Sequence, residues 1–391
     1  MLTRNDWLAE FTAWRRDFHA HPELGYQEHR TASLVAARLE SFGLAVTTGL
    51  AGTGVVGTLR NGSSDRAIAI RADMDALPMQ EENDFGHHSL NRGIMHACGH
   101  DGHTTMLLAA ARHLAATRNF DGTVHFIFQP AEEGGAGAKR MIEAGLFERF
   151  PCQSVFGAYN DPNLDVGIIS ASPGTVNAAS DTVSVRIKGR GGHAARPHQA
   201  VDPVLAGSQI VLALQSIASR RISPLDSVVV SICRFHAGTA HNVIPQEAEL
   251  EGTVRTLTAP VQDLVAEEIP LLIGNVARAA GAEAETSYAR GYPPVVNDAA
   301  TAARAACAAA SVVGEAGVRQ DLPASMGGED FAYYALERPS CFLRIGQRGR
   351  DENGELRGHM PLHHQNYDFN DDILPIGAAL WVAVAEQELS A

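Results

Sequence analysis

The segment from Met95 to His103, which reads MHACGHDGH, is the most informative stretch of the chain. It holds a thiol, three imidazoles and a carboxylate within nine residues. A soft thiolate next to imidazole is ligand chemistry for zinc or a similar divalent ion. The plainer alternative is a buried cysteine in an ordinary loop, with histidines at the surface. The segment taken alone does not decide between the two.

Further potential ligands occur later in the chain. Cys98 and His100 lie just before a predicted helix, so both can reach one ion, or one can lie between two ions. Glu133 would add a hard oxygen ligand, and His363 would come from the far end of the chain. A mixture of sulfur, nitrogen and oxygen ligands suits Zn, Mn, Co or Ni better than Ca or Mg.

Glu132, directly before Glu133, is the candidate catalytic group. A carboxylate beside a metal-bound water can take its proton and then pass it to a leaving amine. Two adjacent glutamates after a strand can divide these roles, one ligating and the other acting as base. An acidic pair that merely caps a solvated turn is the alternative, and the Cys-Gly-His segment favours the catalytic interpretation.

Two aspartates, Asp73 and Asp75, follow a short apolar strand predicted over 67–71. An acidic side chain there can accept a hydrogen bond from a ligand histidine and so fix its ring. We assign that role to Asp75. Turn formation is the alternative, because aspartate favours turns and Pro78 follows closely.

The composition is that of an acidic globular protein. With 391 residues, the chain is longer than one hydrophobic core usually holds, so two domains are expected. Its net charge of -14 argues against nucleic acid as a partner, because phosphate binding needs a basic surface. No apolar run reaches membrane-spanning length, so we expect no membrane partner.

The cysteines indicate a reducing compartment. They are far apart and odd in number, which argues against a disulfide framework. The N-terminal segment is amphipathic and charged, and it lacks the apolar core of a signal peptide. We therefore expect a cytoplasmic protein. The five cysteines are Cys98, Cys152, Cys233, Cys307 and Cys341.

The hydrophobic pattern divides the chain into two domains. Residues 1–179 and 291–391 alternate helices and strands, which predicts an α/β domain whose mostly parallel sheet has helices on both faces. Residues 180–290 follow the order β-α-β-β-α-β of a ferredoxin-like α+β module, inserted into the first domain. The predicted helices are 4–18, 28–42, 102–118, 202–220, 261–280, 298–314 and 371–388, and the strands are 67–71, 123–128, 181–188, 227–235, 247–257, 283–289 and 341–345.

A glycine-rich loop in the inserted module, residues 189–198, carries His193. It lacks the lysine and the spacing of a phosphate-binding loop. Such a loop can place an imidazole over a reacting carbonyl, where it would stabilise an oxyanion. A tight strand-to-helix turn with an incidental histidine is the favoured alternative unless the module closes over the site.

Ordered motifs run along nearly the whole chain: RRDFHAHPELG (15–25), RADMDALP (71–78), MHACGHDGH (95–103), QPAEEG (129–134), GGHAA (191–195), NVIP (242–245), GTVR (252–255), MGGEDF (326–331), and LH (362–363) leading into YDFND (367–371). In these motifs the chain resembles the M20 amidohydrolases. The resemblance is to the branch that contains hippurate hydrolases, N-acyl-amino-acid amidohydrolases and plant auxin-conjugate hydrolases.

The resemblance implies a metal-dependent hydrolase of N-acyl amino acids with one or two divalent ions per subunit. It implies a catalytic domain, an inserted lid or dimerisation domain, and a homodimer or higher homo-oligomer. By position, His193 resembles a histidine of the lid that reaches an active site, often that of the partner subunit. The metal ligands would be Cys98, His100, Glu133 and His363, the general base Glu132, and the substrate contacts Asn242 and Arg255.

One position departs from the branch, which usually has a metal-binding histidine in a motif resembling Gly-Leu-His-Asn. Here residues 156–162 read FGAYNDP, and Tyr159 stands where that histidine would be. A phenol has a pKa of about 10, so it ligates an ion only when deprotonated. Tyr159 could ligate as phenolate, the second metal could be weak or absent, or Tyr159 could contact substrate. We favour one firm metal and a weak or absent second one.

Two rival functions stay open from the sequence. The chain could be a metallo-dipeptidase or a carbamoyl-amino-acid hydrolase of the same broad fold. With its metal site altered at Tyr159, it could instead be a binding protein that keeps the pocket without turnover. The retained Cys98, His100, Glu132, Glu133 and His363 argue against such decay.

Overall fold

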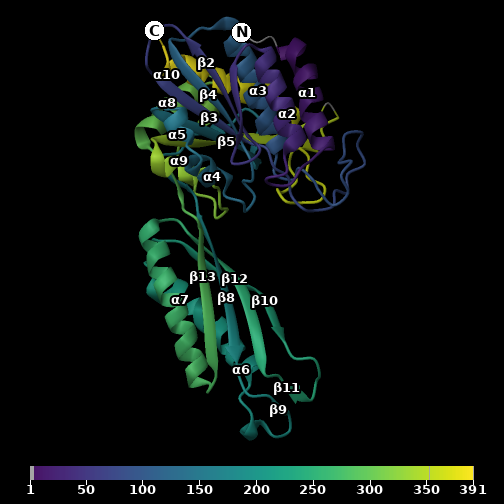
Figure 1. The fold of residues 1–391 in the computed structure, drawn as a ribbon, viewed down its shortest axis with the longest axis vertical. Helices are drawn as coiled ribbons and strands as arrows, with labels where there is room; N and C mark the ends of the chain where they lie inside the picture. Colours follow the sequence, from purple (N-terminus) through teal and green to yellow (C-terminus); the bar gives the residue numbers. More distant parts are fainter. Residues whose placement is uncertain (1–3, 352, 391) are drawn as a thin grey trace. The chain divides into compact units, whose positions relative to one another are not determined.

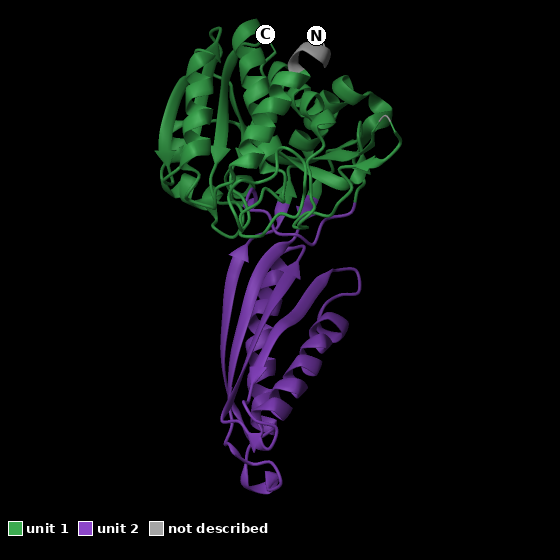
Figure 2. Cartoon of the chain, turned by 90° about the vertical axis from the view of Figure 1, so that its right-hand side faces the viewer, with its two compact units in different colours: residues 1–174, 296–322, 333–391 green, residues 175–295, 323–332 purple. Residues whose placement is uncertain are grey.

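A computed structural model describes residues 4–351 and 353–390. The chain forms two compact units, which are coloured separately in Figure 2. The first unit comprises residues 1–174, 296–322 and 333–391, and the second comprises 175–295 and 323–332. None of the described helices combines the length and the apolar character needed to cross a membrane.

The first unit is built on a nine-stranded sheet (Figure 1). The strand order is β1-β2-β4-β3-β5-β16-β6-β15, and β17 pairs with β16. The central pairs β4-β3, β3-β5 and β5-β16 are parallel, whereas β1-β2 and β2-β4 are antiparallel. The main strands are β1 (Ala45–Leu50), β2 (Gly54–Asn61), β3 (Ala67–Asp73), β4 (Gly122–Gln129), β5 (Ser154–Asp165) and β16 (Ser340–Arg350).

Both faces of this sheet are covered. Every residue of β3 is buried, so the side chains on its two alternating faces both lie away from water. On one face, Ile68 and Ile70 belong to a large core that includes residues of the long helices. This confirms the expected α/β fold with a mostly parallel central sheet. The helices are α1 (Arg4–Ala20), α2 (His29–Ser41), α3 (His100–Thr117), α4 (Gly137–Glu143), α5 (Leu146–Arg149), α8 (Ala299–Val313), α9 (Ala332–Glu337) and α10 (Leu374–Glu388).

The carboxyl ends of the parallel strands gather the candidate site. β3 ends at Asp73, β4 ends shortly before Glu132, and β5 carries Tyr159 near its middle. Because parallel strands end at one edge of a sheet, these side chains are brought to the same region. The helix α3 begins there too, with His100 as its first residue.

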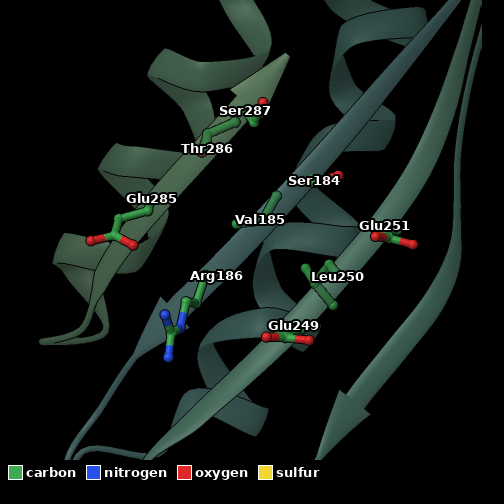
Figure 3. Close-up of a pocket in the computed structure, with 9 residues that line it drawn as sticks. All are labelled: Ser184, Val185, Arg186, Glu249, Leu250, Glu251, Glu285, Thr286 and Ser287. Atoms are coloured by element: carbon green, nitrogen blue, oxygen red, sulfur yellow. The ribbon is translucent and has the colours of Figure 1, made fainter. Parts of the chain in front are cut away.

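The second unit contains a four-stranded antiparallel sheet of order β10-β12-β8-β13. Val183, Val185 and Ile187 of β8 are buried in a core with residues of the two helices, as their alternation predicts. The opposite face is polar, with Ser184 and Arg186 lining a shallow surface pocket (Figure 3). The elements follow the expected order: β8 (Ala179–Lys188), α6 (Pro203–Ser216), β10 (Val228–Ala237), β12 (Glu247–Thr256), α7 (Ala259–Ala279) and β13 (Glu283–Tyr292).

Two predicted helices include a turn that is not α-helical. The helix predicted over 202–220 is α-helical only over Pro203–Ser216 and continues as a π-helical turn over Ile217–Arg221. The last predicted helix begins with a 3-10 turn at Asp371–Ile373, before α10. The remaining short strands are β6 (Ile169–Ser170), β7 (Gly174–Asn177), β9 (Gly192–His193), β11 (Val243–Ile244), β14 (Val295–Asn297), β15 (Val318–Arg319) and β17 (Leu356–Arg357).

Candidate metal centre

Three side chains from distant parts of the chain meet at the sheet edge. One potential ligand atom each from Cys98, Glu133 and His363 lies within 4.8 Å of the other two. Glu133 Oε1 is 3.2 Å from His363 Nε2. His363 adopts a left-handed backbone with φ of 59°, which is unusual for a residue other than glycine. The group offers one sulfur, one oxygen and one nitrogen donor.

A second group adjoins the first. Ligand atoms of His100, Glu132 and Glu133 also lie within 4.8 Å of one another. The Tyr159 hydroxyl lies 3.7 Å from the Cys98 Sγ. The structure therefore places all the predicted ligands, and the doubtful Tyr159, around one small volume.

The donor set fits a divalent cation. Glu133 Oε1 is buried and faces His363 Nε2 at 3.2 Å. Hydrogen bonds to Cys98 and Glu133 raise the pKa of His363 to about 10, so the anionic groups here favour a positive charge. Burial and the charge of Glu133 raise the pKa of the Cys98 thiol, and a bound cation would oppose that shift. Thiolate, imidazole and carboxylate together suit zinc or a similar transition ion.

The turn at residues 98–100, here called the ligand turn, requires a glycine where α3 begins. Gly99 has φ of 90°, and a Cβ at this position would lie 2.1 Å from Asn160 Oδ1. Any other residue would strain the backbone and displace Asn160. Cys98 and His100 therefore flank a position that only glycine can occupy.

Asp75 lies against His100. The ring Nδ1 donates to the Asp75 carbonyl oxygen at 2.8 Å and lies 3.2 Å from its carboxylate Oδ1. The other carboxylate oxygen, Oδ2, accepts from the backbone N–H of Glu133 at 2.9 Å. Asp75 thus fixes the ring of His100 and leaves its Nε2 free to bind an ion. The same carboxylate also holds the segment 131–135, here called the glutamate loop.

A series of buried hydrogen bonds lies next to the centre. Asp73 accepts from Arg71 at 2.7 Å and from His103 Nδ1 at 2.7 Å. His103 Nε2 lies 2.7 Å from Asn160 Oδ1, and the Asn160 amide donates to the Tyr367 hydroxyl at 2.7 Å. Burial would raise the pKa of Asp73, but the positive charges of His100 and Arg71 lower it well below its usual range. His103 lies in the first turn of α3, as predicted, and both nitrogens of its ring take part in this series of hydrogen bonds.

A second buried network lies beside the ligand turn. Asp101, in the first turn of α3, accepts from His19 Nδ1 at 2.9 Å and lies 3.4 Å from Arg15. His19 Nε2 contacts Glu81 at 3.2 Å. Burial opposes the charged imidazole, yet hydrogen bonds to Asp101 and Glu81 raise the pKa of His19 to about 9. These charges connect the N-terminal helix to the residue that follows His100.

Tyr159 is neutral in the absence of an ion. Burial and the neighbouring Cys98 raise its pKa well above the usual value for a phenol. A phenolate ligand here would therefore need a strongly bound cation to ionise it. The raised pKa therefore makes Tyr159 a weaker metal ligand than the histidine that the family pattern leads us to expect at this position.

The candidates of the inserted module belong to the second unit. His193 lies in the short strand β9 and is exposed, and its Nδ1 accepts from the backbone N–H of Ala195 at 3.1 Å. Asn242 is exposed beside β11, to which β9 pairs. Arg255 is half-buried on β12, and burial lowers the pKa of its guanidinium. The ligand groups described above contain none of these three residues.

Sequence reasoning missed several groups that hold the site. Asp101, Asn160 and Tyr367 are buried and have hydrogen-bond partners around the ligand turn, but no role was assigned to them. Arg15 and His19 entered only as parts of a motif. For Arg15, His19 and Asp101, the available signal was a charged residue type inside a motif shared with the family, because a charge buried beside a metal centre needs fixed partners.

Fold and site together define an α/β protein with a centre suited to a divalent cation. The sequence profile of peptidase family M20/M25/M40 matches residues 69–387. The chain is 40% identical to hippurate hydrolase of Campylobacter jejuni over 97% of both chains. It is 39% identical to N-acetylcysteine deacetylase of Bacillus subtilis, over 95% of this chain and 94% of the relative. The chain therefore belongs to this peptidase family.

Solved structures agree with that assignment. A putative aminohydrolase from methicillin-resistant Staphylococcus aureus superposes with a TM-score of 0.89 at 35% identity, covering 99% of this chain and 98% of that one. A dinuclear metal-binding peptidase of the M20 family from Bacillus subtilis superposes with a TM-score of 0.81 at 33% identity, covering 98% of each chain.

Proposed function

We propose that the chain is a metal-dependent amidohydrolase that cleaves N-acyl amino acids into a carboxylic acid and a free amino acid. The observation that carries the proposal is the place of Glu132. Its buried carboxylate lies within 4.8 Å of ligand atoms of His100 and Glu133. Relatives named hippurate hydrolase, N-acetylcysteine deacetylase and N-acyl-L-amino acid amidohydrolase support the reaction and the substrate class.

Each residue of the centre has one task in this reaction. Cys98, His100, Glu133 and His363 would be the metal ligands, and Asp75 keeps the ring of His100 in its binding orientation. A bound divalent cation supplies positive charge that acidifies water and polarises the amide carbonyl. Glu132 takes the proton from the attacking water and delivers it to the leaving nitrogen.

The inserted module would contribute to substrate binding and to catalysis. We assign His193 to the stabilisation of the oxyanion, since a neutral or protonated imidazole can donate to that oxygen. Asn242 and Arg255 are assigned to contacts with the substrate, where the guanidinium suits a carboxylate. We likewise keep residues 180–290 as a lid or dimerisation domain and residues 1–179 with 291–391 as the catalytic domain.

The number of ions is part of the proposal. We infer one firm ion at Cys98, Glu133 and His363 and a weak or absent second one at His100, because Tyr159 is a poor ligand while it is protonated. Zinc, manganese, cobalt and nickel all suit the donors. Elemental analysis after a chelator wash should give about one ion per chain, and Tyr159→His should raise this toward two. Two firmly held ions in the wild-type protein would contradict the inference.

We also propose a homodimer formed through the second unit. The helix α6 has no charged side chain, and it exposes 56% of Leu205 and 73% of Leu212. The strand β10 lies at the edge of its sheet and can pair with another strand. Light scattering should give a dimer mass, and Leu212→Glu should shift it to monomer. A monomeric wild-type protein at micromolar concentration would contradict this proposal.

A substrate screen tests the reaction. Metal-loaded protein is assayed with N-acetyl, N-benzoyl and long-chain N-acyl amino acids, and in parallel with dipeptides and carbamoyl amino acids. Faster hydrolysis of the acyl amino acids supports the proposal. Preference for either of the other classes would favour the corresponding rival enzyme, and ligand binding without any hydrolysis would favour a binding protein.

A cytoplasmic location is proposed from the thiols. All five cysteines are free, and three of them are buried. Unpaired cysteines are typical of a reducing compartment. Cell fractionation with a periplasmic or secreted marker as reference would test the location.

A further inference from the structure

Glu28 is a buried carboxyl that has no task in the proposed reaction. It directly precedes α2 and is fully buried. Its Oε2 accepts from the Thr53 hydroxyl at 2.6 Å, and its Oε1 accepts from the backbone N–H of Ala131 at 2.8 Å. A buried carboxylate is costly unless it is hydrogen-bonded, so this one is held in a defined place.

Ala131 stands immediately before the candidate base. Its backbone is left-handed, with φ of 51°, a conformation that an alanine adopts only when its surroundings impose it. On the other side of Glu132, the N–H of Glu133 donates to Asp75 Oδ2 at 2.9 Å. The two backbone amides that flank Glu132 are thus each bound to a buried carboxylate, one from Glu28 and one from Asp75.

The segment before Glu28 packs against the same loop. A Cβ at Gly25 would lie 2.9 Å from the Ala131 Cβ, so only glycine allows this approach. The Tyr26 hydroxyl donates to the carbonyl oxygen of Gly135 at 2.6 Å. Residues 25–28 therefore contact the glutamate loop at several points along 131–135.

We propose that Glu28 is a positioning residue for Glu132, acting through the backbone of Ala131. The inference rests on the proposed function only for the role of Glu132, since the contact itself is independent of the substrate. Loss of the acceptor would release the Ala131 amide and allow its left-handed backbone to relax. A displacement of about 1 Å at a catalytic group can lower turnover by about 100-fold.

The variants Glu28→Ala and Glu28→Gln test the proposal. The alanine variant should lower kcat by about tenfold or more, with KM and bound metal per chain close to wild type. The glutamine variant should recover most of the lost kcat, because its amide oxygen can still accept from Ala131 and its NH₂ can donate to Thr53. Where Glu28→Ala does not fold, Thr53→Val replaces it and should give a smaller loss of kcat.

Glu23→Ala is the matched control from the same segment. The Glu23 carboxylate accepts from the backbone N–H groups of Arg30 at 2.9 Å and Thr31 at 2.8 Å, at the start of α2. Its removal should lower the melting temperature without changing kcat, since no hydrogen bond of its side chain reaches the glutamate loop. Equal loss of kcat in the Glu23 and Glu28 variants would overturn the positioning role, as would wild-type kcat in Glu28→Ala or an equally inactive Glu28→Gln.

Hydrogen exchange separates this inference from the proposed function. Glu28→Ala should exchange faster than wild type at the peptide covering 130–136, whereas Glu23→Ala should not. If Glu28→Ala exchanges faster than wild type but the wild-type protein hydrolyses no amide, the proposed function fails while the contact of Glu28 with the loop at 131–135 stands. If the wild-type protein hydrolyses amides and Glu28→Ala exchanges at the wild-type rate, only the positioning role of Glu28 is contradicted.

Discussion

The metal centre and the His193 loop place their reactive groups in opposite ways. At the centre, His100 and Asp73 are buried, and each has at least one hydrogen bond that fixes its orientation. In the loop, His193 is exposed and is supported by a two-residue strand pairing. The difference teaches that groups which must tolerate burial beside a cation are fixed by the interior, whereas a group that meets a substrate can lie on a loop.

The largest expected effect lies at the centre itself. Glu132→Gln should keep metal content unchanged and lower turnover by about 1,000-fold or more, because the amide cannot take or deliver a proton. Steady-state kinetics with elemental analysis on the same sample checks both parts. Near-wild-type turnover would remove Glu132 from the mechanism and leave the centre without a base.

The buried network should also appear in the pH dependence of stability. The pKa of His19 is raised to about 9 in the folded protein, so its stabilising contribution is fully present below the unfolded value near 6.5 and is lost as pH rises through about 9. The free energy of unfolding should therefore fall by about 3 kcal/mol more in wild type than in His19→Gln between pH 6 and 10. Denaturant titrations at equal metal loading measure this. Parallel curves for the two proteins would contradict it.

A smaller effect is expected from the exposed loop. His193→Ala should lower kcat by about 100-fold, the usual cost of one oxyanion donor, and should leave the metal content unchanged. Loss of metal in this variant would show that the loop supports the centre. The metal centre and the His193 loop would then not be independent of each other. An unchanged kcat would make His193 an incidental loop residue.

The smallest effect is expected at Arg255. Replacement by methionine should raise KM by about tenfold with little change in kcat, since a charged hydrogen bond to a substrate carboxylate is worth about 1.5–3 kcal/mol. Substrates without the carboxylate should not distinguish the two proteins. A fall in kcat at constant KM would instead place Arg255 at the reacting atoms.

Much of the fold could be predicted from local pattern. The alternation of Val183, Val185 and Ile187 predicts a strand with one wet face, and the structure confirms it. The apolar run at 67–71 likewise predicts a strand, and the structure has β3 there, over Ala67–Asp73. Helix ends were less predictable, as α6 shows, because the last turns depend on tertiary contacts rather than on periodicity.

The candidate ligands could be chosen by residue type, but their supports could not. Cys98, His100 and Glu133 stand out because soft and hard donors cluster beside strand and helix ends. Nothing local to Glu28 predicts that it binds the amide of Ala131, since that contact joins segments far apart in the chain. Buried charges find partners through space, and sequence distance carries no information about them.

The sequence by itself determined the residue types at the centre, the order of the elements and the departure at Tyr159 from the family pattern. Only the tertiary structure decided that Cys98, Glu133 and His363 meet, and that carboxylates from two other segments hold the loop of Glu132. The physical reason is that hydrophobic period fixes local structure, whereas strand pairing and the burial of charge fix which distant segments become neighbours.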